Sequence, residues 1–534
     1  MSSGDKIVDV IVVGAGFAGL AMANRLQELG MSMQGFEAGG DVGGTWYWNR
    51  YPGARCDVQS LEYSYRFSEE LQQEWEWTER FAPQPEILKY ANHVADRFDL
   101  RKNFKFNTTV THARFDEARK CWVVTTDGGE TFAARFLVSA VGCLSTSNLP
   151  KIPGIEKFKG RIIHTGAWPH EGVDLSGKRV GVIGTGSSGV QAIPMIAKEA
   201  ADLTVFQRTA SYCVPAQNKP MPKEEAEQIK QNYKAFREHC GKQFGAVALG
   251  PGTQSALAVD AAERKRIFDE AWERGGLSFQ GAFFDLTFDM KANDLANEYF
   301  KDKIASIVKD PETARKLTPK HRLGVKRLCI DTGYYDTFNR PNVHLVDIKE
   351  EPIEAVTETG IRAGGKEYPL DVLVLATGFD AITGSILKLN IEGRGGRKLR
   401  DDWSHGAQTY LGLGVAGFPN LFIVSGPGSP CVLTNMIYSI EQHVDWIARC
   451  LDDLRKEKVG VIEADAKAQD AWGEELNAMA AFQPLMSQGD NWYTGANVPG
   501  KPRRFMIHLN YPAYVERCDK VAAEGYAGFK KEPA

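Results

Sequence analysis

Two glycine-rich turns each follow a predicted strand and open a predicted helix. The first reads GAGFAG from Gly14 to Gly19, and the second reads GTGSSG from Gly184 to Gly189. Glycines in this spacing permit a tight turn, let backbone N–H groups approach a pyrophosphate, and allow a helix to pack closely on a strand. The sequence therefore predicts two dinucleotide-binding turns, with cofactor contacts at Gly14, Gly16, Phe17, Gly19, Gly184, Thr185, Gly186, Ser187, Ser188 and Gly189.

The charge at the end of the next strand differs between the two units. Glu37 stands 23 residues after Gly14, where a carboxylate accepts from ribose hydroxyls and repels a 2′-phosphate. Arg208 stands 24 residues after Gly184, next to Thr209, where a cation accommodates the 2′-phosphate of NADP. The alternatives are a purely structural turn and a solvated surface arginine. The pair of sites favours FAD held beside an exchanging NADPH.

The elements that must position these turns alternate between strand and helix. Residues 7–13 and 179–183 are near-continuously apolar, as strands buried on both faces of a parallel sheet are. Between about 220 and 320 the chain is charge-rich and favours helix, with a capping box at Asp260 and Glu263 and a stop at Gly275. We expect an α/β fold with two Rossmann-like domains: FAD-binding at 1–145 and 381–534, NADP-binding at 146–216 and 327–380, and a helical insertion at 217–326.

The overall charge excludes some function classes. Lys plus Arg number 64 against 68 Asp plus Glu, a net charge of −4 that argues against a nucleic-acid partner. Nine cysteines without a CxxC pair indicate reduced thiols of a cytoplasmic protein, and they argue against a metal site or a disulfide reductase. The apolar stretch at 10–23 is too short to span a membrane, so we expect no membrane partner.

Two further motifs are unusual enough to indicate a family. Residues 43–57 read GGTWYWNRYPGARCD, which fits GGxWxxxxYPGxxxD, and a second motif reads FxGxxxHxxxWP through Phe158, Gly160, His164, Trp168 and Pro169. Both motifs, with ATG at 376–378 and WYTGAN at 492–497, resemble the Baeyer-Villiger monooxygenases over nearly the whole chain. His170 departs from the acid that most often closes the second motif in that family.

The resemblance implies an enzyme that uses NADPH and O2 to convert ketones to esters or lactones, through a C4a-peroxyflavin and a Criegee intermediate. It places the catalytic cation at Arg327, which never loses its charge and would hold the oxidant as an anion. Asp57 would orient that guanidinium, although an interdomain salt bridge is the alternative. Lys326 would bind the NADP phosphate beside Arg208, and further cofactor contacts would come from Gly44, Thr45, Trp46, Asp57, Arg327 and Trp492.

The resemblance also implies an apolar substrate pocket, formed by Cys143, Leu144, Cys431, Val432, Leu433 and Trp492. Such a lining favours an uncharged, apolar ketone, and Trp492 would close over it as part of a mobile lid. His164 and Trp168 would couple the linker between the domains to cofactor binding. We expect a monomer or a weak oligomer. The alternative functions are an N- or S-oxygenating flavin monooxygenase and a non-catalytic NADPH-binding redox sensor.

Overall fold

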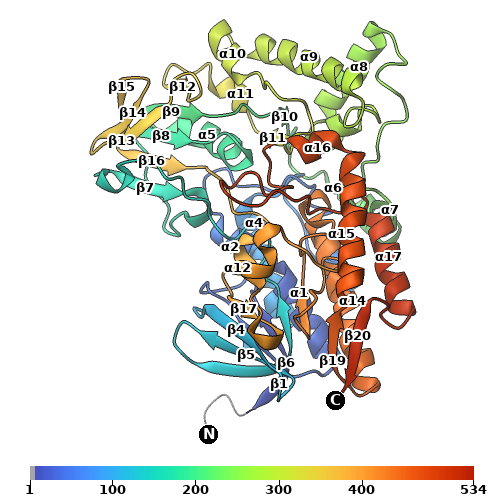
Figure 1. The fold of residues 1–534 in the computed structure, drawn as a ribbon. Helices are drawn as coiled ribbons and strands as arrows, with labels where there is room; N and C mark the ends of the chain where they lie inside the picture. The colour runs from blue at the N-terminus through green and yellow to red at the C-terminus, as the bar shows by residue number, and fades with distance from the viewer. Residues whose placement is uncertain (1–5) are drawn as a thin grey trace.

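Two sheets form the frame of this computed structural model, which describes residues 6–534 (Figure 1). The larger is eight-stranded and mixed, in the order β17-β4-β5-β6-β1-β2-β3, with β18 also paired to β6. Its strands come from both ends of the chain: β1 (Ile7–Val13), β2 (Met33–Phe36), β3 (Phe104–Lys105), β4 (Val110–Asp116), β5 (Cys121–Thr126), β6 (Thr131–Ser139), β17 (Ile391–Glu392) and β18 (Leu421–Ile423).

The second sheet is five-stranded and parallel, in the order β12-β9-β8-β16-β7. Its strands are β7 (Arg161–His164), β8 (Arg179–Ile183), β9 (Asp202–Gln207), β12 (Val343–Asp347) and β16 (Val372–Leu375). Strand β16 ends at Leu375, and the ATG motif at 376–378 forms the turn after it, in which Gly378 takes a φ of +78°. Both Rossmann-like units of the predicted α/β fold are confirmed, each with its glycine turn at the carboxyl end of its first strand.

Three small sheets complete the strand inventory of the described residues. The pair β10 and β11 is parallel, whereas the other two sheets are antiparallel. Their bounds are β10 (Cys213–Pro215), β11 (Cys329–Asp331), β13 (Ile353–Val356), β14 (Gly360–Ala363), β15 (Lys366–Pro369), β19 (Val459–Ala464) and β20 (Phe529–Pro533).

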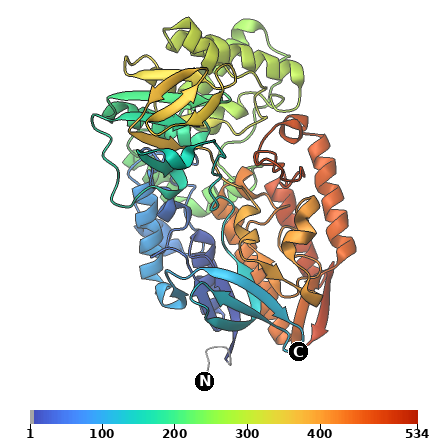
Figure 2. The same ribbon diagram turned by 60° about the vertical axis from the view of Figure 1, so that its left-hand side comes forward.

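Helices cover the faces of both sheets. Those of the first and last parts of the chain are α1 (Phe17–Glu28), α2 (Thr45–Trp48), α3 (Glu69–Glu74), α4 (Gln84–Arg97), α12 (Gly384–Leu387), α13 (Leu399–Asp402), α14 (Met436–Lys456), α15 (Ala466–Ala481), α16 (Pro484–Gln488) and α17 (Tyr511–Ala523). Those of the middle are α5 (Ser187–Glu199), α6 (Lys223–Gln231), α7 (Tyr233–Gly241), α8 (Ala261–Arg274), α9 (Met290–Ile307), α10 (Pro311–Leu317) and α11 (Tyr334–Thr337). Figure 2 shows the blue N-terminal and red C-terminal segments together, below the green and yellow middle.

The eight-stranded sheet and its helices form a first body, and the five-stranded sheet and its helices form a second. The predicted helical insertion is present, but its helices pack on both bodies. Helix α8 begins as expected, because the Asp260 carboxylate accepts from the Glu263 N–H at 2.9 Å, and it ends at Gly275, whose φ is +70°. Helix α7 instead packs on the first body, where Tyr233 donates to the Leu61 carbonyl at 2.6 Å. Charge-rich helices are predictable from composition, but the surface against which each one packs is not.

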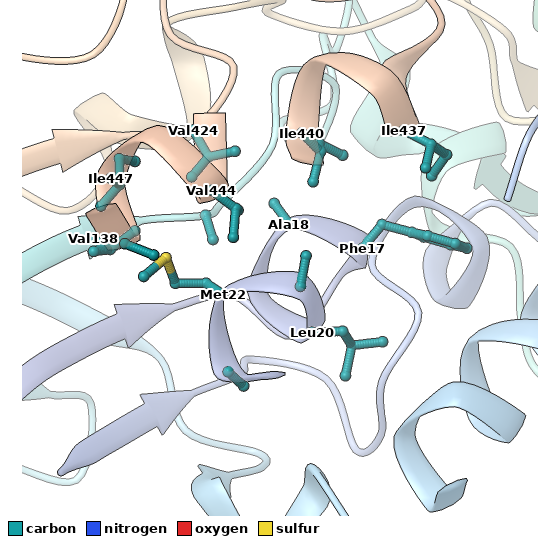
Figure 3. Packing of buried hydrophobic residues seen from close by; sticks show 14 of the residues in the cluster. Phe17, Ala18, Leu20, Met22, Val138, Val424, Ile437, Ile440, Val444 and Ile447 are labelled. Carbon is teal, nitrogen blue, oxygen red and sulfur yellow. The ribbon is translucent and has the colours of Figure 1, made fainter. Parts of the chain in front are cut away.

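The largest core cluster joins α1 to α14 (Figure 3). Met22 of α1 and Val444 and Ile447 of α14 are buried, and Figure 3 shows them interdigitating above the strands. The packing fixes the start of α1, and with it the first glycine turn, against the C-terminal part of the chain. Among residues 6–534, no helix is both long and apolar enough to cross a membrane.

Candidate active site

The first glycine turn leaves backbone N–H groups open to a phosphate. A Cβ atom on Gly14 would lie 2.5 Å from the Ala140 carbonyl oxygen, and one on Gly19 would lie 1.8 Å from the Gly14 carbonyl oxygen. Helix α1 starts after Gly16 without a side-chain cap or an acidic residue in its first turn. Because uncapped helix N-termini attract anions, this cradle fits the pyrophosphate of FAD. The Phe17 side chain instead packs in the core, 5.3 Å from the Tyr65 ring centre.

Glu37 closes the same turn. Its carboxylate accepts from the Ala15 N–H and from the Gly39 N–H, each at 2.7 Å, and the residue is 7% exposed. Burial raises the pKa of Glu37, while the two backbone hydrogen bonds oppose that rise. These bonds hold the carboxylate beside the glycine turn, at the place from which an acid reaches ribose hydroxyls.

The second glycine turn repeats this construction. A Cβ on Gly184 would lie 2.4 Å from the Ala376 carbonyl oxygen, and one on Gly189 would lie 2.3 Å from the Gly184 carbonyl oxygen, whereas Gly186 faces open space. Thr185 donates to the Thr209 carbonyl at 3.0 Å, which ties the turn to the end of β9. Helix α5 begins at Ser187, again without a side-chain cap. The turn therefore fits a second dinucleotide.

Three cations gather beside this second turn. Arg208 and Lys349 are exposed at the ends of β9 and β12, and Lys326 is partly buried. Burial lowers the pKa of Lys326, and the charges of Arg208 and Lys349 lower it further. Repulsion of this kind marks a place where a bound anion is stabilising, as the 2′-phosphate of NADP would be. Lys349 was missed by the sequence analysis, because no glycine motif sets its spacing.

The motif at 43–57 connects the two turns. At one end, a Cβ on Gly44 would lie 2.7 Å from the Gly16 Cα, so the two backbones are in contact. At the other end, the Tyr51 hydroxyl donates to Gln191 Oε1 of α5 at 2.8 Å, and a Cβ on Gly53 would lie 2.4 Å from the Gln191 carbonyl oxygen. Between them, Thr45 opens α2, and Trp46 Nε1 donates to the Tyr63 hydroxyl at 3.1 Å. One segment therefore sets the spacing of both dinucleotide sites.

The second motif lies on the edge strand β7 and the turn after it. Gly160 is required because a Cβ there would lie 2.5 Å from both the Asp371 carbonyl oxygen and the Phe158 ring. His164 Nδ1 accepts from the Gly166 N–H at 3.0 Å, and its ring meets the Phe379 ring edge-on at 5.8 Å. Trp168 is buried, and its neighbour Pro169 accepts at its carbonyl from the Gly172 N–H. His170 contacts the Tyr47 ring at 4.8 Å, so the two motifs touch.

Arg327 and Asp57 form an ion pair between the two bodies. Arg327 Nε and Nη2 both lie 2.7 Å from Asp57 Oδ2, and Nη1 donates to the Val432 carbonyl at 2.8 Å. Their side chains are 23% and 28% exposed. Burial lowers the pKa of Arg327, but the charge of Asp57 and its hydrogen bond raise that pKa above its ordinary value overall. The guanidinium is therefore a fixed, permanently charged donor.

The predicted pocket residues belong to one apolar cluster beside this ion pair. Cys143, Cys431 and Val432 are buried there, and the partly buried members include Leu144, Leu433 and Trp492. The segment that carries Trp492 lies against the loop that carries Arg327, since Asn491 Nδ2 donates to the Val325 carbonyl at 2.9 Å. Tyr493 was also missed by the sequence analysis: burial raises its pKa to about 12, and the charge of Arg327 opposes that rise.

Comparison with known proteins identifies the chain's relatives. A family model described as flavin-binding monooxygenase-like matches residues 7–222. A Baeyer-Villiger monooxygenase from Pseudooceanicola batsensis is 43% identical over 98% of this chain and 96% of its own length. A phenazine N-monooxygenase from Lysobacter antibioticus is 42% identical over 98% and 96%. The solved structure of an oxidised steroid monooxygenase bound to NADP is 48% identical, with a TM-score of 0.94 over 99% of this chain and 100% of that one.

Two dinucleotide turns that converge on a part-buried arginine define an FAD-containing, NADPH-dependent oxidoreductase. Relatives that are 42 to 43% identical to this chain over almost its full length assign it to one family within that class. The chain belongs to the Baeyer-Villiger monooxygenases. The resemblance carried by the two sequence motifs is thereby confirmed, and the redox-sensor alternative is set aside.

Proposed function

We propose that the protein converts uncharged, apolar ketones to esters or lactones with NADPH and O2, and that Arg327 is its catalytic cation. The observation that supports this most directly is the position of Arg327. Its guanidinium is paired with Asp57 of the 43–57 motif and bonded to the Val432 carbonyl of the apolar cluster. The charge is thus held directly beside the apolar cluster that contains Cys431 and Val432.

The residues of the site have two kinds of role: some bind the cofactors, and Arg327 holds a positive charge next to the reacting oxygen. FAD, when bound, supplies hydride acceptance from NADPH and the activation of O2. Glu37 and the turn at 14–19 bind FAD, while Arg208, Lys326 and the turn at 184–189 bind NADPH. Of the five N–H donors of the guanidinium, two contact Asp57 and one contacts Val432, which leaves two for a reacting oxygen. Such donors stabilise negative charge on that oxygen.

Substitution of Arg327 tests the assignment. We expect Arg327→Ala to retain bound FAD and its reduction by NADPH, but to form ester about 10²-fold more slowly or worse, because a preorganised donor is lost. Flavin absorbance after rapid mixing measures the reduction, and gas chromatography measures the ester. Arg517→Ala, on the exposed face of α17, is the matched control. A normal ester yield from Arg327→Ala would overturn the proposal.

N-oxygenation is the second candidate, because the phenazine N-monooxygenase is about as similar to this chain as the Baeyer-Villiger relative is. Both reactions need the same cofactors, so the folds do not separate them. A panel of apolar ketones and aromatic N-heterocycles distinguishes the two. We expect ester or lactone from ketones, and N-oxide formation with no ester from any ketone would favour this candidate.

We also infer the domain boundaries, compartment and assembly. The strands of the eight-stranded sheet support an FAD domain at 1–145 and 381–534, and those of the five-stranded sheet support an NADP domain at 146–216 and 327–380, with the insertion at 217–326. Nine free, buried cysteines support a reducing, cytoplasmic location. We propose a monomer or weak oligomer, which light scattering after gel filtration tests.

A further inference from the structure

Two of the nine free cysteines face each other beneath the second glycine turn. Cys213 and Cys329 are in register on the parallel strands β10 and β11, and both are buried. Residues in register on neighbouring strands point to the same face, with backbones about 4.8 Å apart. That separation lies within the roughly 4.4 to 6.8 Å between Cα atoms that a disulfide requires. The two thiols can therefore be joined without moving either strand far.

The surroundings of the pair link it to the NADP turn. Cys329 Sγ lies 3.5 Å from the Ser187 hydroxyl, and Ser187 is the exposed first residue of α5. Cys213 Sγ lies 3.5 Å from the Ser211 carbonyl oxygen, and Ser211 donates to the Thr185 carbonyl at 2.6 Å. The exposed Ser187, at the start of α5 in the proposed NADP turn, therefore contacts the buried Cys329 sulfur directly.

The two thiols differ in acidity. A hydrogen bond from Cys213 lowers the pKa of Cys329 against the effect of burial, with further help from Ser187 and from the charge of Arg327. Burial raises the pKa of Cys213, and its hydrogen bond to Cys329 raises it further. A thiolate is the form that reacts with peroxides, so Cys329 is the residue that would be oxidised first.

We propose that Cys213 and Cys329 form a peroxide-sensitive dithiol, whose closure to a disulfide weakens NADP binding at the turn 184–189. The Cys329 thiolate attacks hydrogen peroxide, the O–O bond breaks, and a sulfenic acid forms while hydroxide takes up a proton to become water. The Cys213 thiol then attacks that sulfur, the S–S bond forms, and the sulfenic oxygen leaves as a second water. Two thiols are oxidised by two electrons, and one peroxide is reduced to two waters.

The structural consequence follows from the contacts of Cys329. Bond formation draws its sulfur toward Cys213 and away from the Ser187 hydroxyl, so the first residue of α5 loses its partner. Cys329 is the first residue of β11, and Lys326 and Arg327 lie three and two residues before it in the chain. The cross-link thus acts on both the turn and the cation that are proposed to hold NADP. Reduction of the disulfide restores both.

The test uses the purified FAD-loaded protein and hydrogen peroxide. We expect intact-mass analysis to show a loss of about 2 Da and peptide mapping to find Cys213 joined to Cys329. Calorimetric titration should then show NADP+ binding weakened at least threefold and recovered after dithiothreitol. Titration with NADP+ does not depend on turnover, so the result stands apart from the proposed ketone oxidation.

Variants make the test specific. Cys213→Ala should keep its NADP+ affinity after peroxide treatment. If that variant loses its flavin absorbance, Cys213→Ser repeats the measurement. The control is Cys450→Ala, at a buried position of α14, which should lose NADP+ affinity after peroxide as the parent protein does. A second close thiol pair, Cys143 with Cys431, provides a check on the mapping. Linkage of that pair instead, no linkage at all, or linkage of Cys213 to Cys329 with unchanged NADP+ affinity would each overturn the proposal.

Discussion

At the residue scale, the proposed NADP site is a group of cations that form no ion pair with a carboxylate among residues 6–534. Arg208, Lys326 and Lys349 have no ion pair within the described residues, whereas the neighbouring Arg327 is paired with Asp57. Cations without an ion-pair partner favour the binding of an anionic ligand. The discrimination between NADPH and NADH should therefore depend on more than the one arginine that the glycine spacing locates.

Substitution of these cations should change cofactor preference. The ratio of kcat/KM for NADPH to kcat/KM for NADH measures this preference. We expect Arg208→Ala to lower this ratio about tenfold or more, since a hydrogen bond to a charged group contributes roughly 1.5 to 3 kcal/mol. We expect Lys349→Ala to lower the same ratio by a smaller factor. Steady-state kinetics with both nucleotides measure the ratio. Lys198→Ala, at the exposed far end of α5, should leave it unchanged. An unaltered ratio in both test variants would contradict the assignment.

At the scale of elements, residues 61–64 fasten α7 and α14 to the chain that follows the 43–57 motif. The backbone carbonyl of Glu62 accepts from Arg237 Nη1 at 2.7 Å and from Asn435 Nδ2 at 2.8 Å. The Glu62 carboxylate accepts from the Ala248 N–H at 3.2 Å. Asn435 caps α14 directly after the proposed pocket residues 431–433, so this buried junction positions the proposed pocket wall.

Glu62 should make stability depend on pH. Burial raises its pKa to about 7, although the Ala248 N–H and the charges of Arg237 and Arg80 oppose that rise. Between pH 4.5 and about 7 the folded state then binds more protons than the unfolded state, so this group costs stability as pH rises and costs most above pH 7. We expect Glu62→Gln to raise the unfolding temperature at pH 8 and to raise it less at pH 5.

Thermal unfolding followed by flavin fluorescence at the two pH values measures this effect. Glu224→Gln, exposed on α6, is the control and should change the unfolding temperature at neither pH. If Glu62→Gln lowered the unfolding temperature equally at both values, the carboxylate would be stabilising in its charged form, and the prediction would be wrong.

At the scale of the molecule, the body built on the eight-stranded sheet depends on contacts between the first and last parts of the chain. Helix α1 near the N-terminus packs along α14, and Ile447 is fully buried in that interface (Figure 3). We expect Ile447→Ala to lower the free energy of unfolding by about 2 to 5 kcal/mol, through lost burial and the cavity left behind. Urea unfolding measures it. Phe482→Ala, 78% exposed, should have little effect, and equal losses in both variants would contradict the role of the interface.

The features that could be predicted from the sequence are those that a short-range residue pattern encodes. Glycine spacing located both turns, because Gly14, Gly19, Gly184 and Gly189 each have no room for a Cβ. Lys349 and Tyr493 were not predictable, since they approach Lys326 and Arg327 only through long-range folding. The division of the helical insertion was missed for the same reason. Composition predicts helices, whereas side-chain complementarity decides which body each helix covers.

The position of β18 in the larger sheet affects how the chain folds during its synthesis on the ribosome. Leu421 to Ile423 pair with Leu137 to Ser139 of β6, at the carboxyl end of that central strand. At about 5 to 20 residues per second, a ribosome needs roughly 14 to 56 s to proceed from Ser139 to Leu421. During that interval the apolar end of β6 has no β18 partner, and unpaired strand edges promote aggregation. Production of this protein in a host cell should therefore be limited by chaperone capacity and translation speed during this interval.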